Sequence, residues 1–192
     1  MYKINIQKQI ETYAVNNYYL PRRVKPILQL DIRSKILIIG AAPGLHAHKT
    51  GIPWNDKSGE RLRGWLNVSE RDFYNKSNFA LISMNFWFPG YNKNGTDKAP
   101  SLRDAEVWHR PLLQLLPNIK ITLLVGSCAQ RYYLKDKMKS TMTNTVKAWQ
   151  EYLPSVVVLP HPSWHNNAWL TQNSWFETSL LPDLRRRVRK YL

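Results

Sequence analysis

A glycine- and proline-rich turn is the first group of residues that could bind a ligand. It consists of Gly40, Ala41, Ala42, Pro43 and Gly44. Glycine permits positive φ angles and a close approach of the backbone, whereas proline fixes its own φ and lacks an amide donor. Such a rigid turn can present backbone amides to a ligand, although a turn of this kind after a strand is commonly only a turn. Its spacing fits neither a Walker loop nor a dinucleotide fingerprint.

A histidine between two prolines is the second such group. His161 lies between Pro160 and Pro162, and Ser163 follows. Because the prolines restrict the backbone on both sides, the imidazole can be directed at a ligand as a donor or as an imidazolium. The alternative is a loop histidine that bonds to a local carbonyl group.

Four short apolar runs would position these groups. They are nearly continuous, which is typical of strands buried on both faces of a parallel sheet. The runs cover residues 36–39, 79–83, 121–125 and 156–159. Helices are expected over residues 58–68, 101–116, 127–135, 143–152 and 172–191. This alternation predicts a three-layer α/β/α sandwich around a mainly parallel four-stranded sheet, with the loops that follow the strands along one rim.

Two of the expected helices carry signals at their ends. The stretch 101–116 opens with Ser101 and Asp104 in a capping-box-like arrangement, and Pro117 ends it. The stretch 172–191 contains Pro182, which should kink or divide it.

The two groups together resemble the signature motifs of the uracil-DNA glycosylases. His161, Pro162 and Ser163 follow the turn after about 120 residues. Residues 50–59 are similar to the block after the first motif in the iron–sulfur and broad-specificity bacterial branches. Asn85 ends the second predicted strand, where relatives place a base-reading asparagine. The resemblance covers roughly residues 35–181. The length of 192 residues suits one α/β domain over residues 1–192, with two very small domains as the alternative.

The resemblance also implies an activity. A relative of this family flips a uracil or related damaged base out of DNA and hydrolyses its N-glycosidic bond. His161 would donate to uracil O2 as negative charge collects there. Asp56 would be the carboxylate that assists the attacking water, or it would cap a helix beside Ser58. Asn55 would position the water if Asp56 points away.

Binding roles follow from the same resemblance. Residues 40–44 would contact the base, and Trp54 would be its stacking platform or would simply pack in the core. Asn85 would read the base edge through its amide, or would serve as a strand-end cap. Three residues after the histidine would meet DNA, with an aromatic ring able to wedge into the gap that a flipped base leaves. These are Ser163, Trp164 and His165.

Some positions depart from the family pattern. Ala41 and Ala42 stand where other branches carry an acidic or amide residue, and Trp164 stands where many relatives have proline. A second hypothesis is therefore a catalytically inactive or re-specialised nucleic-acid-binding protein on the same fold. Cys128 is the only cysteine, so the chain can form neither an internal disulfide nor a cysteine-ligated cluster.

No cofactor is expected. His46 and His48 invite a metal interpretation by their spacing, but no third ligand cluster is evident, so we expect no metal either.

The charge of the chain favours a polyanionic partner. Lys and Arg total 28 against 13 acidic residues, which gives a net charge of +15. Such an excess favours DNA by neutralising its phosphates, while a solvated surface and a membrane surface are the alternatives. No apolar run approaches the roughly 18 residues of a membrane span, and the N-terminal residues lack the apolar core of a secretory signal. We expect a cytoplasmic monomer that does not enter a membrane.

Overall fold

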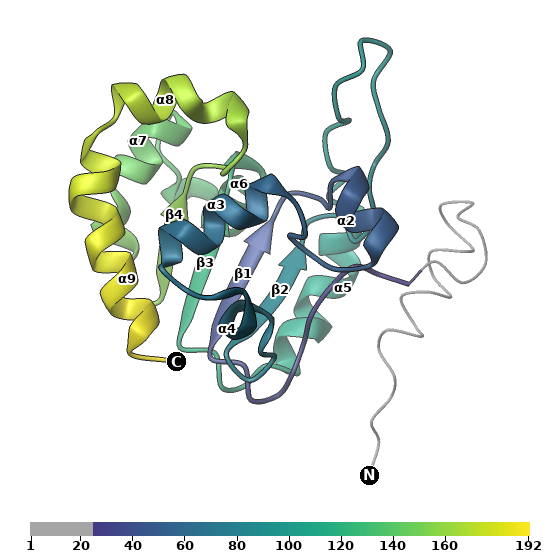
Figure 1. Ribbon diagram of the computed structural model, residues 1–192, viewed down its shortest axis with the longest axis horizontal. Coiled ribbons are helices and arrows are strands. Elements are labelled where there is room, and N and C mark those ends of the chain that lie inside the picture. The colour runs from purple at the N-terminus through teal and green to yellow at the C-terminus, as the bar shows by residue number, and fades with distance from the viewer. Residues whose placement is uncertain (1–24) are drawn as a thin grey trace.

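The computed structural model describes residues 25–192 (Figure 1). Residues 1–24, which belong to the predicted domain and include the segment considered for a secretory signal, lie outside the described residues. Four strands form one sheet in the order β2-β1-β3-β4, and every neighbouring pair is parallel. The strands are β1 (Ile36–Gly40), β2 (Phe79–Ser83), β3 (Ile121–Val125) and β4 (Val156–Leu159). The four predicted apolar runs are confirmed as strands.

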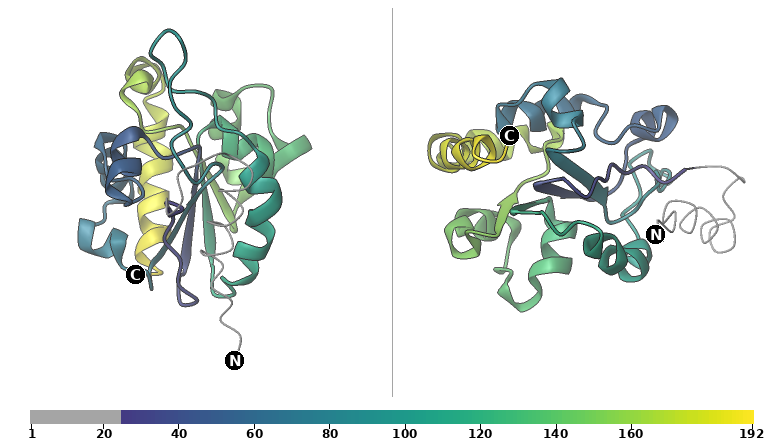
Figure 2. Two further views of the ribbon diagram at one scale, coloured as in Figure 1. Left: turned by 90° about the vertical axis from the view of Figure 1, so that its right-hand side faces the viewer. Right: turned by 90° about the horizontal axis from the view of Figure 1, so that it is seen from below.

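Helices cover both faces of the sheet and make three layers, as predicted (Figure 2). One face carries α2 (Leu45–Thr50), α3 (Lys57–Leu66), α4 (Glu70–Tyr74) and α9 (Leu181–Arg189). The other carries α5 (Arg103–Gln114), α6 (Ser127–Leu134) and α7 (Met142–Lys147). The short α8 (Asn167–Gln172) follows the loop after β4. Between residues 25 and 192, no helix has both the length and the apolar character needed to cross a membrane.

Shorter helical turns divide two of the predicted helices. The stretch 143–152 consists of α7 and a 3₁₀ turn, η2 (Trp149–Tyr152). The C-terminal stretch begins with a π-helical turn, η4 (Phe176–Leu180), and continues as α9. Pro182 is the second residue of α9 and follows directly on η4, so the residue that lacks an N–H lies where the helix type changes. The predicted division at this proline therefore falls at the start of α9.

The predicted capping box at the start of α5 is wrong. The helix begins at Arg103, and Ser101 Oγ accepts a hydrogen bond from the Arg103 amide at 3.2 Å. Asp104 is fully buried, and its Oδ2 accepts bonds from Asn85 Nδ2 and the Phe86 amide, both at 3.1 Å. The carboxylate therefore holds the segment after β2 against α5 instead of closing the helix end.

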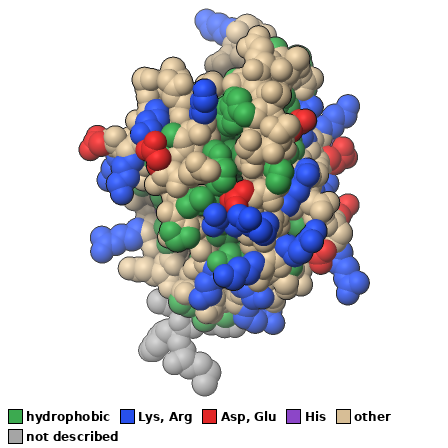
Figure 3. Space-filling model, turned by 90° about the vertical axis from the view of Figure 1, so that its left-hand side faces the viewer, with side chains coloured by type: hydrophobic (Ala, Val, Ile, Leu, Met, Phe, Trp, Pro, Cys, Tyr) green, Lys and Arg blue, Asp and Glu red, His purple; other side chains and the backbone are tan. Residues whose placement is uncertain are grey.

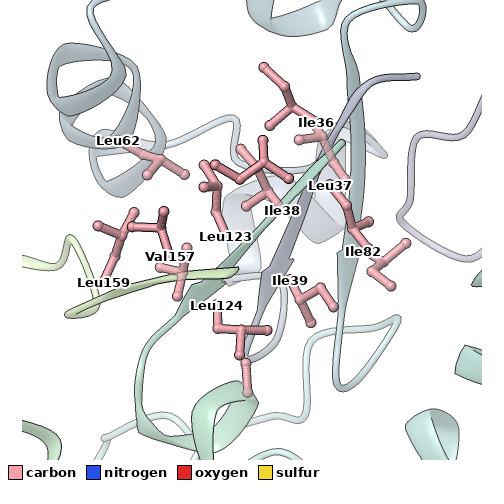
Figure 4. Close-up of a cluster of buried hydrophobic side chains, with 14 of the residues drawn as sticks. Ile36, Leu37, Ile38, Ile39, Leu62, Ile82, Leu123, Leu124, Val157 and Leu159 are labelled. Carbon is pink, nitrogen blue, oxygen red and sulfur yellow. The ribbon is translucent and has the colours of Figure 1, made fainter. Parts of the chain in front are cut away.

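The core lies on both faces of the sheet (Figure 4). All five residues of β1 are buried, and Leu62 of α3 packs from one side. Burying a side chain such as Leu or Ile contributes about 1.5–3 kcal/mol, so this double-sided burial fixes the register of the central strands. The carboxyl ends of the strands are thereby held at one rim.

The rim contains a topological switch point. The chain leaves β1 toward β2 on one side, whereas β3 leads to β4 on the other. In open α/β sheets, ligands bind outside the carboxyl ends of the strands at such a point. Between β2 and α5 the chain rises beyond this rim as a narrow loop (Figures 1 and 2). Its tip, residues 90–98, is called the rim hairpin below.

Candidate active site

A pocket of about 270 Å³ opens at the carboxyl rim. It combines the turn after β1, the segment before α3, the loop after β4 and the rim hairpin. The predicted site residues that line it are residues 41–44, Trp54, Asp56, His161, Ser163, Trp164 and His165. The fold thus brings together side chains that lie more than a hundred residues apart. Gly40, Asn55 and Asn85 are not among the lining residues.

Trp54 is held over two glycines. Its φ is +58°, a left-handed conformation that is uncommon for a bulky residue. A Cβ at Gly40 would lie 2.7 Å from Trp54 Cζ2, and a Cβ at Gly59 would overlap the Trp54 carbonyl oxygen. Only glycine at these two positions leaves room for the Trp54 ring and backbone. Gly40 therefore contributes to the pocket indirectly, because it lets the Trp54 ring pack closely against the backbone.

Asp56 is both a helix cap and a pocket residue. Its Oδ1 accepts a hydrogen bond from the Gly59 amide at 2.9 Å, which caps α3. Its Oδ2 faces the turn, since a Cβ at Gly44 would lie 3.3 Å from it. Oδ2 makes no hydrogen bond with any residue between 25 and 192. One carboxylate can thus fix a helix end and still offer an oxygen to a water molecule.

His161 is fixed through its backbone and its ring. Its carbonyl accepts a hydrogen bond from Asn166 Nδ2 at 2.7 Å, and the ring lies over Gly126. The Trp54 ring is its other neighbour, with 5.9 Å between ring centroids and 31° between planes. Neither imidazole nitrogen bonds to a local carbonyl of the described residues, so both remain available to a ligand.

Burial sets the charge of His161. Loss of solvent lowers the pKa of its imidazole below the usual value, and the nearby Asp56 and Asp97 carboxylates offset part of this effect. The ring is therefore neutral around neutral pH. A neutral imidazole carries one N–H donor, which can bond to an oxygen on which negative charge is building.

Comparison with known proteins identifies the family of the chain. The family model of the uracil DNA glycosylase superfamily matches residues 28–185. The chain belongs to this superfamily. Among solved structures, it is similar to a solution NMR structure from Methanosarcina acetivorans that is provisionally named a uracil DNA glycosylase. The identity is 15%, the match covers 82% of this chain and 93% of that chain, and the TM-score is 0.43.

In this superfamily member, the Asn85 amide is already engaged by the protein. Its Nδ2 donates to Asp104, and its Oδ1 accepts from the Ser101 amide at 2.5 Å. Asn85 is buried, and reading a base edge would require these bonds to exchange. Asn55 donates to Thr50 Oγ1 at 3.3 Å, so its amide points toward the end of α2. The roles predicted for these two asparagines stay predictions.

The loop after His161 presents aromatic surface. Trp164 is 70% exposed, and its ring lies 3.8 Å from that of His165, centroid to centroid. Arg61 of α3 donates to the Ser163 carbonyl at 3.0 Å and anchors the start of this loop. The exposure suits a ring that enters DNA, and the wedge role of Trp164 stays a prediction.

Three features of this glycosylase-family site were not predicted from the sequence. Gly126 has φ +86° and packs against the His161 ring, so the glycine directly after β3 was the available signal. Gly59 lies in the block recognised by resemblance, yet its contact with Trp54 depends on tertiary structure. Asp97 lines the pocket from the rim hairpin, in a segment that carried no motif.

The two histidines near the turn have different surroundings. His48 Nδ1 accepts a hydrogen bond from the Phe88 amide at 3.4 Å, and His46 is exposed on α2. Within residues 25–192, no three or more His, Cys, Asp or Glu side chains gather in a way that could hold a metal ion.

Proposed function

We propose that this protein hydrolyses the N-glycosidic bond of uracil or a related damaged base in DNA. The observation that carries the proposal is the meeting of Asp56, His161 and Trp54 in one pocket at the carboxyl rim. This hydrolysis needs a carboxylate to orient the water and a neutral imidazole to donate to the leaving base. It also needs a flat ring on which the base can stack. Membership in the uracil DNA glycosylase superfamily supports the same activity.

Each group has one task in the proposed reaction. The flipped base stacks on Trp54 while the bond between C1′ and the base nitrogen lengthens. The bond's electron pair leaves with the base, and the His161 N–H donates to O2, where negative charge collects. Asp56 Oδ2 orients a water and accepts one of its protons as the water oxygen bonds to C1′. Asp56 then returns this proton to solvent, and the departed base anion takes up a proton from solvent. The products are the free base and an abasic site.

The charge of the chain suits DNA as a partner. The chain has a net charge of +15, and Lys and Arg side chains outnumber acidic ones on the face drawn in Figure 3. Contacts between such side chains and phosphates supply affinity that is independent of sequence. Base choice would then depend on the pocket, while the exposed Trp164 fills the space left in the duplex.

The test is excision from a labelled duplex that carries one uracil, scored as abasic sites under single-turnover conditions. His161→Ala should slow excision by about 10²–10³-fold, the range for losing one such donor, and leave DNA affinity nearly unchanged. His46→Ala is the matched control, because His46 is exposed and lies outside the pocket lining. A variant that binds far more weakly yet cleaves normally at saturation would make His161 a DNA-contact residue.

The second candidate function is DNA binding without catalysis. Ala41 and Ala42 favour it, because these two pocket positions offer only methyl groups and backbone. Wild-type protein that binds the uracil duplex but yields no abasic sites across a panel of lesions would support this candidate and contradict the first.

A further inference from the structure

The rim hairpin is an ordered arm. Its two limbs pair through an antiparallel bridge between Tyr91 and Asp97. The Lys98 amide donates to the Gly90 carbonyl at 2.9 Å, and the Asn92 amide donates to the Thr96 carbonyl at 2.7 Å. This arm therefore has a defined backbone, although most of its residues are exposed.

The hairpin is also tied to the body of the protein. At its base, the Phe88 amide donates to His48 of α2, and the Phe88 ring packs edge-on against Tyr91 with centroids 4.9 Å apart. Gly95 has φ +81°, which allows the tight turn at the tip. The hairpin can thus hold a side chain in a fixed place relative to the rim.

Asp97 is the acidic residue that this arm brings to the site. Its carbonyl accepts a hydrogen bond from Asn92 Nδ2 at 3.1 Å, so its backbone is clamped from both limbs. Its side chain lines the same pocket as Asp56 and His161. Among the described residues, the Asp97 carboxylate has no ion-pair or hydrogen-bond partner. It is close enough to His161 to favour the protonated form of that ring.

A carboxylate that has no cationic partner among the described residues is unfavourable where a protein binds DNA, because it repels the phosphates. It becomes favourable when positive charge develops nearby, as it does on the deoxyribose while the glycosidic bond breaks. A flipped nucleotide stays joined to the strand on both sides, so its sugar lies nearer the pocket mouth than its base does. Asp97 is exposed at that mouth, whereas Asp56 is partly buried as the cap of α3.

We propose that Asp97 is a second carboxylate of the active site and stabilises the positive charge that develops on the deoxyribose. This inference rests on the proposed glycosylase function. It divides the work between two acids, since Asp56 orients the water and Asp97 acts on the sugar. No proton moves to or from Asp97, so its contribution is electrostatic and is realised in the transition state.

Removing the charge of Asp97 should affect DNA affinity and excision rate in opposite directions. Asp97→Asn removes the charge and keeps the shape, so DNA should bind equally well or a few-fold more tightly. Single-turnover excision should slow by about 10-fold, the order expected for a unit charge several ångströms away at a partly solvated site. Asp97→Glu keeps the charge, so it should keep most of the wild-type excision rate.

The control is Asp136→Asn, which removes an exposed carboxylate from the 3₁₀ turn after α6, outside the pocket lining. Both variants are compared with wild type for thermal unfolding, for affinity toward a duplex with a stable abasic analogue, and for excision rate at saturation. Rate loss in Asp97→Asn alone, with unchanged unfolding and unweakened affinity, would support the inference.

Three results would overturn it. Equal rates for Asp97→Asn and Asp136→Asn in an active wild-type background would remove Asp97 from the site and leave the proposed function intact. Parallel loss of rate and affinity would make the hairpin a DNA-contact arm. A wild-type protein without excision would overturn the proposed function, and this inference with it.

Discussion

The contact between Gly59 and Trp54 makes a sharp prediction about how the site is held. A Cβ at Gly59 would overlap the Trp54 carbonyl oxygen and would lie 2.7 Å from the carbonyl carbon. These are backbone atoms of a residue already at φ +58°, so no side-chain rotation relieves the clash. In Gly59→Ala the segment before α3 must shift by roughly 1.5–2 Å to regain van der Waals separation.

The size of the effect follows from two opposing terms. Overpacking a tight contact costs about 1–3 kcal/mol, whereas alanine in a helix is more favourable than glycine by about 1 kcal/mol. Gly64 in the same helix provides the matched control, because a Cβ there would meet nothing within 4 Å. Gly59→Ala should therefore lower the free energy of unfolding by up to about 2 kcal/mol, while Gly64→Ala should raise it by up to about 1 kcal/mol.

Urea and thermal unfolding of the two variants measure this difference, which corresponds to up to about 12 °C in Tm for a protein of this size. The excision rate should also distinguish the two variants. Gly59→Ala moves the Trp54 ring relative to His161 and should slow the reaction, whereas Gly64→Ala should match wild type. If both alanines raised stability equally, the segment would be loose and the clamp on Trp54 would be refuted.

Two further predictions concern titratable groups. Asp56→Asn keeps an oxygen for the Gly59 amide, and asparagine is an equally favoured cap, so the free energy of unfolding should change little. Turnover should fall by about 10²-fold or more. Unchanged turnover would assign the orientation of the water to another group. Burial lowers the pKa of His109 from 6.5 to about 4. Because only the unfolded chain takes up this proton between those values, the free energy of unfolding should fall as pH drops from about 6.5 to about 4, by on the order of 3 kcal/mol. His109→Gln should flatten that slope in urea titrations, and equal slopes would contradict the assignment.

The sheet and its rim could be predicted because their signals are local. Each strand is a short run of buried apolar residues, and alternation with helices leaves few topologies to consider. The rim follows from parallel pairing, which places the residues after β1 and β4 at the same end of the sheet. The sequence left two alternatives for Asp56, a helix cap or a water-orienting carboxylate. In the structure one oxygen caps α3 and the other faces Gly44, while the role toward water stays a prediction.

The missed features depend on contacts between distant segments. Asp104 has the spacing of a helix cap. In the buried interior its carboxylate instead accepts hydrogen bonds from the side-chain amide of Asn85 and the backbone amide of Phe86, which follow β2. Asp97 lies in a polar segment without periodicity, which gives no sign that a hairpin folds there. The role of Gly126 is visible only once β4 brings His161 beside it.

Close packing over glycine explains how a site with a plain turn can still be well defined. Ala41 and Ala42 bring no functional group to the pocket, so its polar chemistry comes from side chains on other segments. Their positions depend on Gly40 and Gly59 beneath Trp54, which in turn packs beside the His161 ring. A substitution at Ala41 or Ala42 can therefore change what the pocket accepts without moving the groups that react, whereas a methyl group added at Gly40 or Gly59 beneath Trp54 moves them directly. This separation allows the rim to keep its geometry while the lining of the turn varies.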